Sequence, residues 1–262
     1  MTVNVLNVAK VYLCSLFNRL EYPCCLCGQS TSSASGLCSG CFGDLPRLSG
    51  PLCRCALPLA DGEECYESDD LAPLCLRCHD RCPSFLGIQA PLLYCQPLAG
   101  LINGWKHHGR LYLQQPLQHL LINQLATLPE ADLVVPVPLH WRRQWQRGFN
   151  QTALLASALA DRHGLPFADV LRRPNSQRHQ QGSNASQRRA AVHDSFISRA
   201  PLKGQRVLLV DDVITTTSTV RAASNALLEA GAGGVSVVAL CRVLPPDFDE
   251  PASLSRITDR SG

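Results

Sequence analysis

The chain has 262 residues, of which 45% are hydrophobic and 17% charged, so it can bury a substantial core and global disorder is excluded. Its net charge of +3 is too small to indicate a polyanionic partner by itself. All of the 24 basic residues except Lys10, Lys106 and Lys203 are arginines, whose planar guanidinium group suits phosphates and carboxylates. Arginines gather in residues 141–199 and acidic residues in residues 24–82, which predicts different partners for the two regions.

Residues 1–21 are predicted to form an amphipathic helix that docks on another surface. Apolar side chains recur in this segment at the spacing of a helix. Asn4, Lys10 and Arg19 are among the polar residues that interrupt it, so it resembles neither a secretory signal nor a membrane span of about 20 residues. We therefore expect a cytoplasmic protein without a membrane span, in which paired cysteines are more often metal ligands than disulfides.

Residues 22–85 are predicted to form a cysteine-rich zinc module. Eleven of the 14 cysteines lie between Cys24 and Cys82, and long apolar runs are scarce there. A segment of this composition cannot build a hydrophobic core of its own and needs a covalent or metal link to hold it together.

Two C-x-x-C pairs open this module, formed by Cys24 with Cys27 and by Cys38 with Cys41. Each C-x-x-C turn points two sulfurs at one place, and two such turns supply the four tetrahedral ligands of a structural zinc ion. Cys25 could replace Cys24 in this set, because the sequence does not distinguish the two neighbours. The alternative is a group of buried thiols without a metal.

A second set of four cysteines follows, with Cys53 and Cys55 in a C-x-C pair and Cys75 and Cys78 in a C-x-x-C pair. The C-x-C spacing is less usual for zinc, so a second zinc site and a group of unligated thiols are both open interpretations. Four sulfur ligands leave no position for water, and we therefore expect zinc here to serve folding rather than catalysis.

Three cysteines, Cys14, Cys95 and Cys241, lie outside these pairs and inside apolar runs. An isolated cysteine of this kind usually behaves as a small hydrophobic residue. We therefore expect all three to be buried and not to bind metal.

Residues 87–244 are predicted to form an α/β domain with a mostly parallel sheet flanked by helices. Strand-like apolar runs occupy residues 88–94, 133–139, 206–212 and 235–243. Helical patterns lie between them, near residues 112–127, 150–163 and 218–230. Such alternation of buried strands with helices is typical of a parallel sheet.

Two polar segments fit neither the helical nor the strand period. Residues 172–200 are rich in Gln, Ser and Arg and are predicted to form a long loop or flap. Residues 245–262 are predicted to be a disordered tail.

Two adjacent carboxylates, Asp211 and Asp212, end a predicted buried strand. Five consecutive hydroxyl residues follow shortly and open a predicted helix: Thr215, Thr216, Thr217, Ser218 and Thr219. Ligands of open α/β sheets bind at the carboxyl ends of the strands, and a helix N-terminus attracts phosphate. The carboxylates could hold a sugar diol, or a Mg²⁺ ion that arrives with the substrate. This stretch therefore predicts a site for a phosphorylated ribose.

An ordinary strand-to-helix turn is the alternative interpretation of this stretch. In such a turn Asp212 would only cap the following helix. One acid and one hydroxyl residue would suffice for a cap, so two acids and five hydroxyl residues favour the binding site.

Residues 207–219, VLLVDDVITTTST, resemble the phosphoribosyl pyrophosphate (PRPP) motif of type I phosphoribosyltransferases. The wider chain is similar to the ComF/GntX family of bacterial proteins, in which a cysteine zinc module precedes a phosphoribosyltransferase-like domain. The similar blocks, which cover about residues 22–244, are CCLCG with LCSGC, LINGWKHHGR, VPVPLHWRRQWQRGFNQ, and a flap with Gln180, Arg188 and Phe196.

The resemblance implies that the protein binds PRPP with Mg²⁺ and transfers phosphoribose to a nucleophile with loss of pyrophosphate. Asp211 and Asp212 would hold the ribose diol and steady the positive charge that develops on the sugar. Residues 215–219 would bind the 5′-phosphate. The catalysis implied is therefore positional and electrostatic.

Three basic residues could complete this site: Arg142, Arg143 and Lys106. The arginines follow a predicted strand, which places them at the same edge of the sheet as the aspartates, and their bidentate geometry suits pyrophosphate. A solvated basic turn is the alternative for this pair. Lys106 could reach a phosphate, whereas His107 and His108 have no metal-ligand spacing and are expected at the surface.

The chain departs from the family pattern at Thr217, where the family has glycine in the phosphate loop. Glycine permits a positive φ and close approach of the backbone to a phosphate, whereas a β-branched residue restricts both. Two further departures are Ala191, where the family usually has asparagine, and the Cys53–Cys55 pair, where it usually has C-x-x-C.

The alternative function is that of a non-catalytic accessory protein, which senses PRPP or handles single-stranded DNA. The resemblance suggests this function because members of the family are linked to DNA uptake in competence. Thr217 favours this interpretation. The zinc module would then dock on a partner, and the basic residues 141–199 would contact single-stranded DNA or a DNA-uptake helicase.

Overall fold

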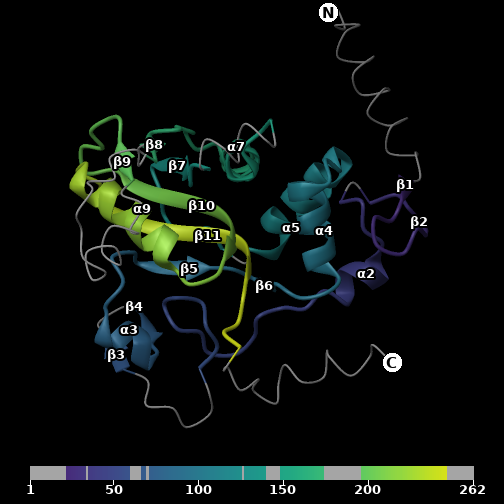
Figure 1. Cartoon of the computed structure of the whole chain (residues 1–262), viewed down its shortest axis with the longest axis horizontal. Helices are drawn as coiled ribbons and strands as arrows, with labels where there is room; N and C mark the ends of the chain where they lie inside the picture. Colours follow the sequence, from purple (N-terminus) through teal and green to yellow (C-terminus); the bar gives the residue numbers. More distant parts are fainter. Residues whose placement is uncertain are drawn as a thin grey trace, which may run out of the picture.

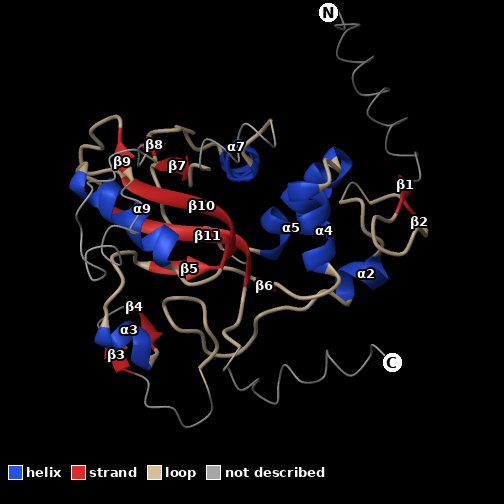
Figure 2. Ribbon diagram, viewed as in Figure 1, coloured by secondary structure: helices blue, strands red, loops and turns tan. Residues whose placement is uncertain are grey.

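Figures 1 and 2 show the computed structural model of the chain, which describes residues 22–33, 35–59, 66–68, 71–125, 127–139, 148–173 and 196–246. Several predicted features lie outside these ranges: the helix 1–21, Arg142 and Arg143, most of the segment 172–200, and nearly all of the tail 245–262. These features stay predictions.

A five-stranded sheet and its flanking helices make up the largest part of the described chain. The strands of this sheet are β5 (Gly87–Gln89), β6 (Leu92–Leu93), β7 (Leu133–Pro136), β10 (Arg206–Ile214) and β11 (Gly234–Arg242). The flanking helices are α4 (Leu98–His107), the 3-10 turn η1 (Leu111–Leu113), α5 (Gln114–Gln124), α7 (Gln151–His163) and α9 (Ser218–Glu229). The shorter elements are β1 (Tyr22–Pro23), β2 (Ser30–Thr31), α2 (Ser39–Gly43), β3 (Tyr66–Ser68), β4 (Leu71–Leu74), α3 (Leu76–Asp80), β8 (Leu171–Arg172) and β9 (Ile197–Ser198). No helix within the described residues is long and apolar enough to cross a bilayer.

All strand pairs of the central sheet are parallel, in the order β5, β11, β10, β7, and β6 pairs with a later part of β11. This arrangement confirms the predicted α/β fold with a parallel sheet. The predicted strand 88–94 is split into β5 and β6, because Pro91 has no N–H to donate to a neighbouring strand. Strand β10 continues to Ile214, past the predicted end at residue 212.

The two faces of the sheet pack against different helices, because side chains alternate along each strand. Leu208 and Val210 of β10 belong to a core that includes buried residues of α4, α5 and α7. Val207 and Leu209 belong to a second core, formed with α9 on the opposite face. Helices therefore cover both faces, and β10 lies at the centre of the two cores.

Helix α4 is the one long helix of the described chain that the sequence patterns do not predict. Six of its ten residues are buried, among them Leu98, Ile102 and Trp105. Its exposed side is formed by Gly100, Asn103 and His107, so it carries few polar side chains, and its two glycines lower the helix propensity of the segment. Lys106, one of the predicted site residues, lies in its last turn.

The other three long helices lie where the sequence predicts them. Helices α5 and α9 fall within the predicted ranges 112–127 and 218–230. Helix α7 begins after Asn150, whose side chain accepts a hydrogen bond from the backbone N–H of Thr152. It ends at Gly164, where a φ of 65° requires the left-handed conformation that glycine adopts most readily.

The segment 22–85 comprises two small units that lie apart from each other, as Figure 1 shows. The first unit contains β1, β2 and α2, and its Leu37 and Leu45 join the core of α4 and α5. The second unit contains β3, β4 and α3 and encloses a separate small core with Leu57 and Leu74. The predicted boundaries of the cysteine module stay predictions.

Candidate functional site

The adjacent residues Asp211 and Asp212 lie near the end of β10, where the sheet narrows. Val210 is the last residue of β10 that pairs with β7, opposite Pro136. Asp211 still pairs with Ala239 of β11. The aspartates therefore stand just past the end of one neighbouring strand, at the carboxyl edge where ligands of open α/β sheets bind.

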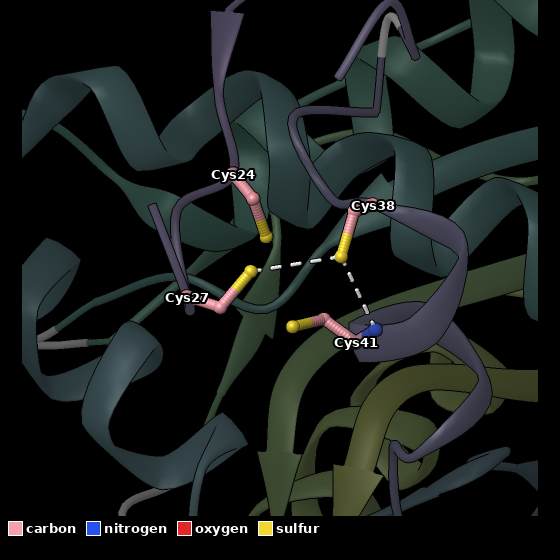
Figure 3. Close-up of side chains that lie close together, drawn as sticks. All are labelled: Cys24, Cys27, Cys38 and Cys41. Atoms are coloured by element: carbon pink, nitrogen blue, oxygen red, sulfur yellow. Dashed lines mark hydrogen bonds between the residues drawn. The ribbon is translucent and has the colours of Figure 1, made fainter. Parts of the chain in front are cut away.

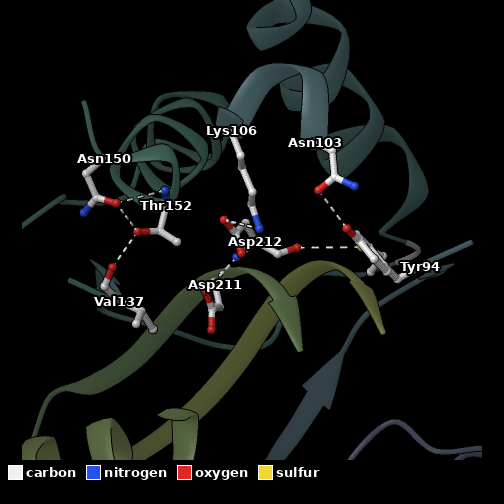
Figure 4. A network of polar contacts seen from close by, with 9 residues as sticks. Tyr94, Asn103, Lys106, Val137, Asn150, Thr152, Asp211 and Asp212 are labelled. Carbon is white, nitrogen blue, oxygen red and sulfur yellow. Dashed lines mark hydrogen bonds and ion pairs between the residues drawn. The ribbon is translucent and has the colours of Figure 1, made fainter. Parts of the chain in front are cut away.

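The two carboxylates point to opposite faces of the strand, as neighbouring side chains of a strand do. On the face of α4, Oδ2 of Asp212 lies 2.8 Å from Nζ of Lys106, and both side chains are largely buried. Oδ1 of Asp211 accepts a hydrogen bond of 2.8 Å from the backbone N–H of Asp212. Figure 4 shows Lys106 extending from its helix to Asp212, with the Asp211 side chain on the other side of the ribbon. The structure thus brings the predicted lysine and the predicted acid pair to one place.

The surroundings of Asp211 favour its protonated form. Removal from water raises the pKa of Asp211 to about 7, and the negative charge of Asp212 acts in the same direction. The positive charges of Lys106 and Arg173 lower it only in part. Near neutral pH this carboxyl is therefore poised between its neutral and charged forms, and a cation that entered the site would favour the charged form.

A cavity of about 680 Å³ opens beside the two aspartates. Asp211 and Asp212 line it, together with Lys106, Thr215 and Thr219. Trp105 and Phe149, whose ring centroids are 6.0 Å apart, provide an apolar wall. The cavity is therefore lined by acidic residues, a cation, hydroxyl residues and aromatic rings.

Several polar residues of this cavity are not singled out by the sequence patterns. Tyr94 donates its hydroxyl hydrogen to Oδ1 of Asn103 over 3.0 Å, and Oγ1 of Thr152 donates to the backbone carbonyl of Val137 (Figure 4). The first three of these residues come from segments far apart in the sequence, so no local motif marks them. Arg173, which belongs to the arginine-rich residues 141–199 that the sequence does single out, also lines the cavity.

The hydroxyl residues form the turn between β10 and α9. Thr216 and Ser218 are exposed, and their hydroxyl oxygens lie 2.8 Å apart. Helix α9 begins at Ser218, and the side chain of Thr217 before it makes no capping hydrogen bond. The interpretation of Asp212 as a helix cap is wrong, because Asp212 pairs with Lys106 and β10 continues for two residues after it.

Thr217 adopts the left-handed conformation that glycine would permit, with φ 61° and ψ −6°. The loop therefore takes this shape despite the β-branched residue, although a left-handed non-glycine residue costs about 1–2 kcal/mol. One turn further along α9, Nε of Arg221 donates to Oγ1 of Thr217 over 3.3 Å. Glycine at this position could not make that contact.

The first cysteine cluster consists of four side chains that point toward a common centre, as Figure 3 shows: Cys24, Cys27, Cys38 and Cys41. Their Sγ atoms all lie within 4.8 Å of one another. The sulfurs of Cys27 and Cys38 are 3.7 Å apart, close to the edge of about 3.8 Å that tetrahedral zinc with Zn–S bonds of about 2.3 Å requires. Cys25 is outside this group, so the geometry selects Cys24 over its neighbour. The cluster can hold a zinc ion.

The second cysteine cluster consists of Cys53, Cys55, Cys75 and Cys78, whose Sγ atoms also lie within 4.8 Å of one another. The sulfur of Cys55 is 3.4 Å from that of Cys53 and 4.0 Å from that of Cys75. The backbone N–H of Cys75 donates to Sγ of Cys53 over 3.1 Å. The C-x-C spacing is therefore compatible with four converging sulfurs, and this cluster can hold a zinc ion as well.

The three cysteines predicted to be buried and the two histidines predicted to be exposed can be compared with the structure. Cys241 is buried, as predicted, and Cys14 lies outside the described residues. Cys95 is exposed, so the prediction that it is buried is wrong. It stands in the connection between β6 and α4, where the chain leaves the sheet. His107 and His108 are exposed, as predicted.

Comparison with known proteins shows which family and which relatives the chain resembles. Residues 150–257 match the model of the phosphoribosyl transferase domain family. The chain is 32% identical over 241 residues to competence protein F of Haemophilus influenzae, which covers 87% of this chain and 100% of that protein. It is 31% identical over 229 residues to DNA utilization protein YhgH of Salmonella typhi, which covers 84% of this chain and 97% of that protein. Among solved structures, orotate phosphoribosyltransferase from Aeropyrum pernix is similar at 23% identity and a TM-score of 0.33, over 57% of this chain and 69% of that chain.

We expect the substitution Asp211→Asn to stabilise the protein in a pH-dependent way. The pKa of about 7 in the folded chain lies above the ordinary 3.8, so the charged carboxylate costs folding free energy. The wild type should lose stability relative to the variant as the pH rises from about 4 to about 7, by on the order of 1–3 kcal/mol, with a constant difference at higher pH. Thermal unfolding followed by circular dichroism measures this difference.

The asparagine keeps the oxygen that accepts the N–H of Asp212, so the substitution changes mainly the charge. Asp161→Asn is the control, because Asp161 is exposed on α7. Its effect should not vary over the same pH range. A stability difference for Asp211→Asn that stays constant or shrinks as the pH rises would contradict the assignment.

Proposed function

Because the chain belongs to the ComF/GntX family and contains a phosphoribosyl transferase domain, we propose that it binds PRPP together with Mg²⁺ and transfers phosphoribose to a nucleophile with release of pyrophosphate. One observation carries this proposal: Asp211, Asp212, Thr215 and Thr219 line the same cavity of about 680 Å³. A phosphorylated ribose needs diol-binding carboxylates and phosphate-binding donors together.

The 5′-phosphate would bind at the turn 215–219. The first turn of α9 offers backbone N–H groups and the positive end of the helix dipole, and the side chain of Thr217 does not cap them. The hydroxyls of Thr216 and Ser218, 2.8 Å apart and exposed, add donors. This turn therefore has the donors that a phosphate dianion requires.

The ribose would meet the two aspartates, which play different parts. The ion pair with Lys106 orients Asp212, so Asp212 can accept a hydrogen bond from a ribose hydroxyl. As the bond between the anomeric carbon and the pyrophosphate oxygen breaks, positive charge develops on the sugar, and both carboxylates would stabilise it. The bonding pair leaves with pyrophosphate, and the nucleophile supplies the pair for the new bond.

Mg²⁺ fits the donor set because carboxylate oxygens are its usual protein ligands. Lys106 already occupies one side of Asp212, so Asp211 is the more available carboxylate. When bound, Mg²⁺ would neutralise charge on the leaving pyrophosphate. Arg142 and Arg143 would clamp the same group, as the sequence predicts.

We expect calorimetry to detect saturable binding of PRPP in the presence of Mg²⁺. The double substitution Asp211→Asn/Asp212→Asn should weaken this binding at least about 100-fold, because it removes two charged acceptors while keeping the side-chain shape.

Asp161→Asn, on the exposed face of α7, is the matched control and should bind like the wild type. The absence of saturable heat with wild-type protein would refute the proposed function. Equal binding by the double variant would refute the assignment of the aspartates.

We propose that each cysteine cluster holds one structural zinc ion, in a cytoplasmic protein whose thiols stay reduced. Elemental analysis of reduced, freshly purified protein should find two zinc ions per chain, one for each cluster. Cys24→Ser should lower the content to one. Cys25→Ser should leave it unchanged, because Cys25 lies outside the cluster. Metal-free wild-type protein, or equal loss in both variants, would contradict this assignment.

We also propose a role in DNA uptake, because two relatives are named for competence and for DNA utilization. The arginine-rich residues 141–199 would contact the phosphates of single-stranded DNA, and Arg172 is an exposed member of this region that the structure describes.

Retention of single-stranded DNA on a filter should therefore fall as the salt concentration rises, and the triple substitution Arg142→Ala/Arg143→Ala/Arg172→Ala should weaken it about tenfold or more. Arg206→Ala is the control, because Arg206 is exposed, lies outside the region and pairs with acidic residues. The DNA proposal fails if the wild type retains no DNA or if both variants behave alike.

A further inference from the structure

The second cysteine cluster lies directly beside the turn that would bind phosphate. Three of its cysteines, Cys55, Cys75 and Cys78, and residues 215–218 of the turn line a cavity of about 440 Å³, to which Arg221 and Arg242 also contribute. Among the residues that the structure describes, those of the first cysteine cluster do not line this cavity. The two clusters are therefore not equivalent, since only the second one adjoins residues 215–218.

Arg221 of α9 joins the phosphate turn to the second cluster. Its Nε donates to Oγ1 of Thr217 over 3.3 Å. Its Nη1 donates to the backbone carbonyl of Cys82 over 3.1 Å, and its Nη2 donates to Sγ of Cys78 over 3.6 Å. The guanidinium also lies over the ring of Phe85, 5.7 Å from its centroid. One side chain thus contacts both the strained threonine and a candidate zinc ligand.

Arg242, the last residue of β11, makes a second connection of the same kind. It is only 3% exposed. Its Nε donates to the backbone carbonyl of Cys55 over 3.1 Å. Its Nη1 donates to the carbonyls of Ile214, Thr215 and Val243. The start of the phosphate turn and the C-x-C pair are therefore held by the same guanidinium.

The charge of a zinc-loaded cluster suits these two arginines. Four thiolates around one Zn²⁺ carry a net charge of about −2. Burying the guanidinium of Arg242 costs free energy, and a nearby negative centre offsets part of that cost. The same centre would attract Arg221, which already donates to one of its sulfurs. Zinc in this cluster would therefore stabilise the observed positions of both side chains.

We propose that Arg221 and Arg242 are positioning residues that brace the phosphate turn against the second cysteine cluster, so that zinc in this cluster and a phosphate in the turn stabilise each other. The inference rests on the proposed function, since the phosphate is that of PRPP. Coupling of two binding sites is reciprocal: the factor by which zinc tightens PRPP binding is the factor by which PRPP tightens zinc binding.

The first experiment tests the brace without ligand. Arg221→Lys keeps the positive charge but cannot reach three partners at once. Backbone amides of residues 215–221 should exchange hydrogen about tenfold faster in this variant than in the wild type. Arg47→Lys is the matched control, because Arg47 donates to backbone carbonyls next to the first cluster. With two zinc ions in all three proteins, unchanged exchange in Arg221→Lys would overturn the proposal.

The second experiment tests the coupling in the full chain. Saturating PRPP with Mg²⁺ should make the zinc of the second cluster about tenfold harder for a chelator to remove at equilibrium. Arg221→Lys should lose this effect and bind PRPP about tenfold more weakly, whereas Arg47→Lys should keep both. PRPP binding without any effect on zinc would overturn the inference. If the wild type does not bind PRPP, only the proposed function is overturned. The hydrogen-exchange measurement then still tests whether Arg221 holds the turn in place.

A third measurement identifies the residue that is braced. Glycine at position 217 adopts the left-handed conformation without strain, so the turn should need the arginine less. Thr217→Gly should therefore restore most of the PRPP affinity that Arg221→Lys loses, and it should slow the exchange of residues 215–221 in that background. A merely structural role of Arg221 would not be rescued in this way. The absence of any rescue would overturn the assignment of Thr217 as the braced residue.

Discussion

The alternation of side chains along β10 is the constraint on which the candidate site depends. From Val207 to Val210 the strand is buried on both faces and pairs on both sides. Asp211 and Asp212 are the first residues past the end of β7, and alternation sends them to opposite faces. One meets Lys106, while removal from water raises the pKa of the other to about 7. Two chemically identical neighbours thus acquire different properties from their position alone.

The cysteine clusters extend this arrangement, because each supports a different wall of the site. The first unit packs against α4 and α5, and Arg47 of this unit donates to Oε1 of Gln124 at the end of α5 over 3.1 Å. Helix α4 carries Lys106, so the first unit lies behind the cationic wall. The second unit lies behind the phosphate turn, through Arg221 and Arg242. Short segments that cannot form a core of their own can hold such positions once a metal links them.

Much of the fold can be predicted from local patterns, because buried parallel strands and amphipathic helices leave clear periodicities. Helix α4 could not be predicted in this way, because most of its residues are buried and few polar side chains mark its exposed side. The exposure of Cys95 could not be predicted either, because most of its sequence neighbours are apolar although the connection lies at the surface. The acid pair and the hydroxyl turn are contiguous in sequence and could be recognised there. Residues such as Thr152 and Arg242 could not, because their roles arise from contacts with distant segments. An arginine inside the apolar run VSVVALCRV was the available signal for a buried cation.

In the phosphate turn, the strain of the left-handed Thr217 and the stabilisation by its hydrogen bond with Arg221 are nearly equal in size. Its conformation costs about 1–2 kcal/mol, and a hydrogen bond from a charged donor contributes about 1.5–3 kcal/mol when well formed. The contact with Arg221 is long, at 3.3 Å, so it offsets the strain without greatly exceeding it. A glycine turn would hold the same shape with no tether. With threonine, the shape depends on what anchors the arginine, and that anchor is the second cysteine cluster. If the turn binds phosphate as proposed, threonine at position 217 would give the second cysteine cluster, which does not line the larger cavity, an influence over that binding.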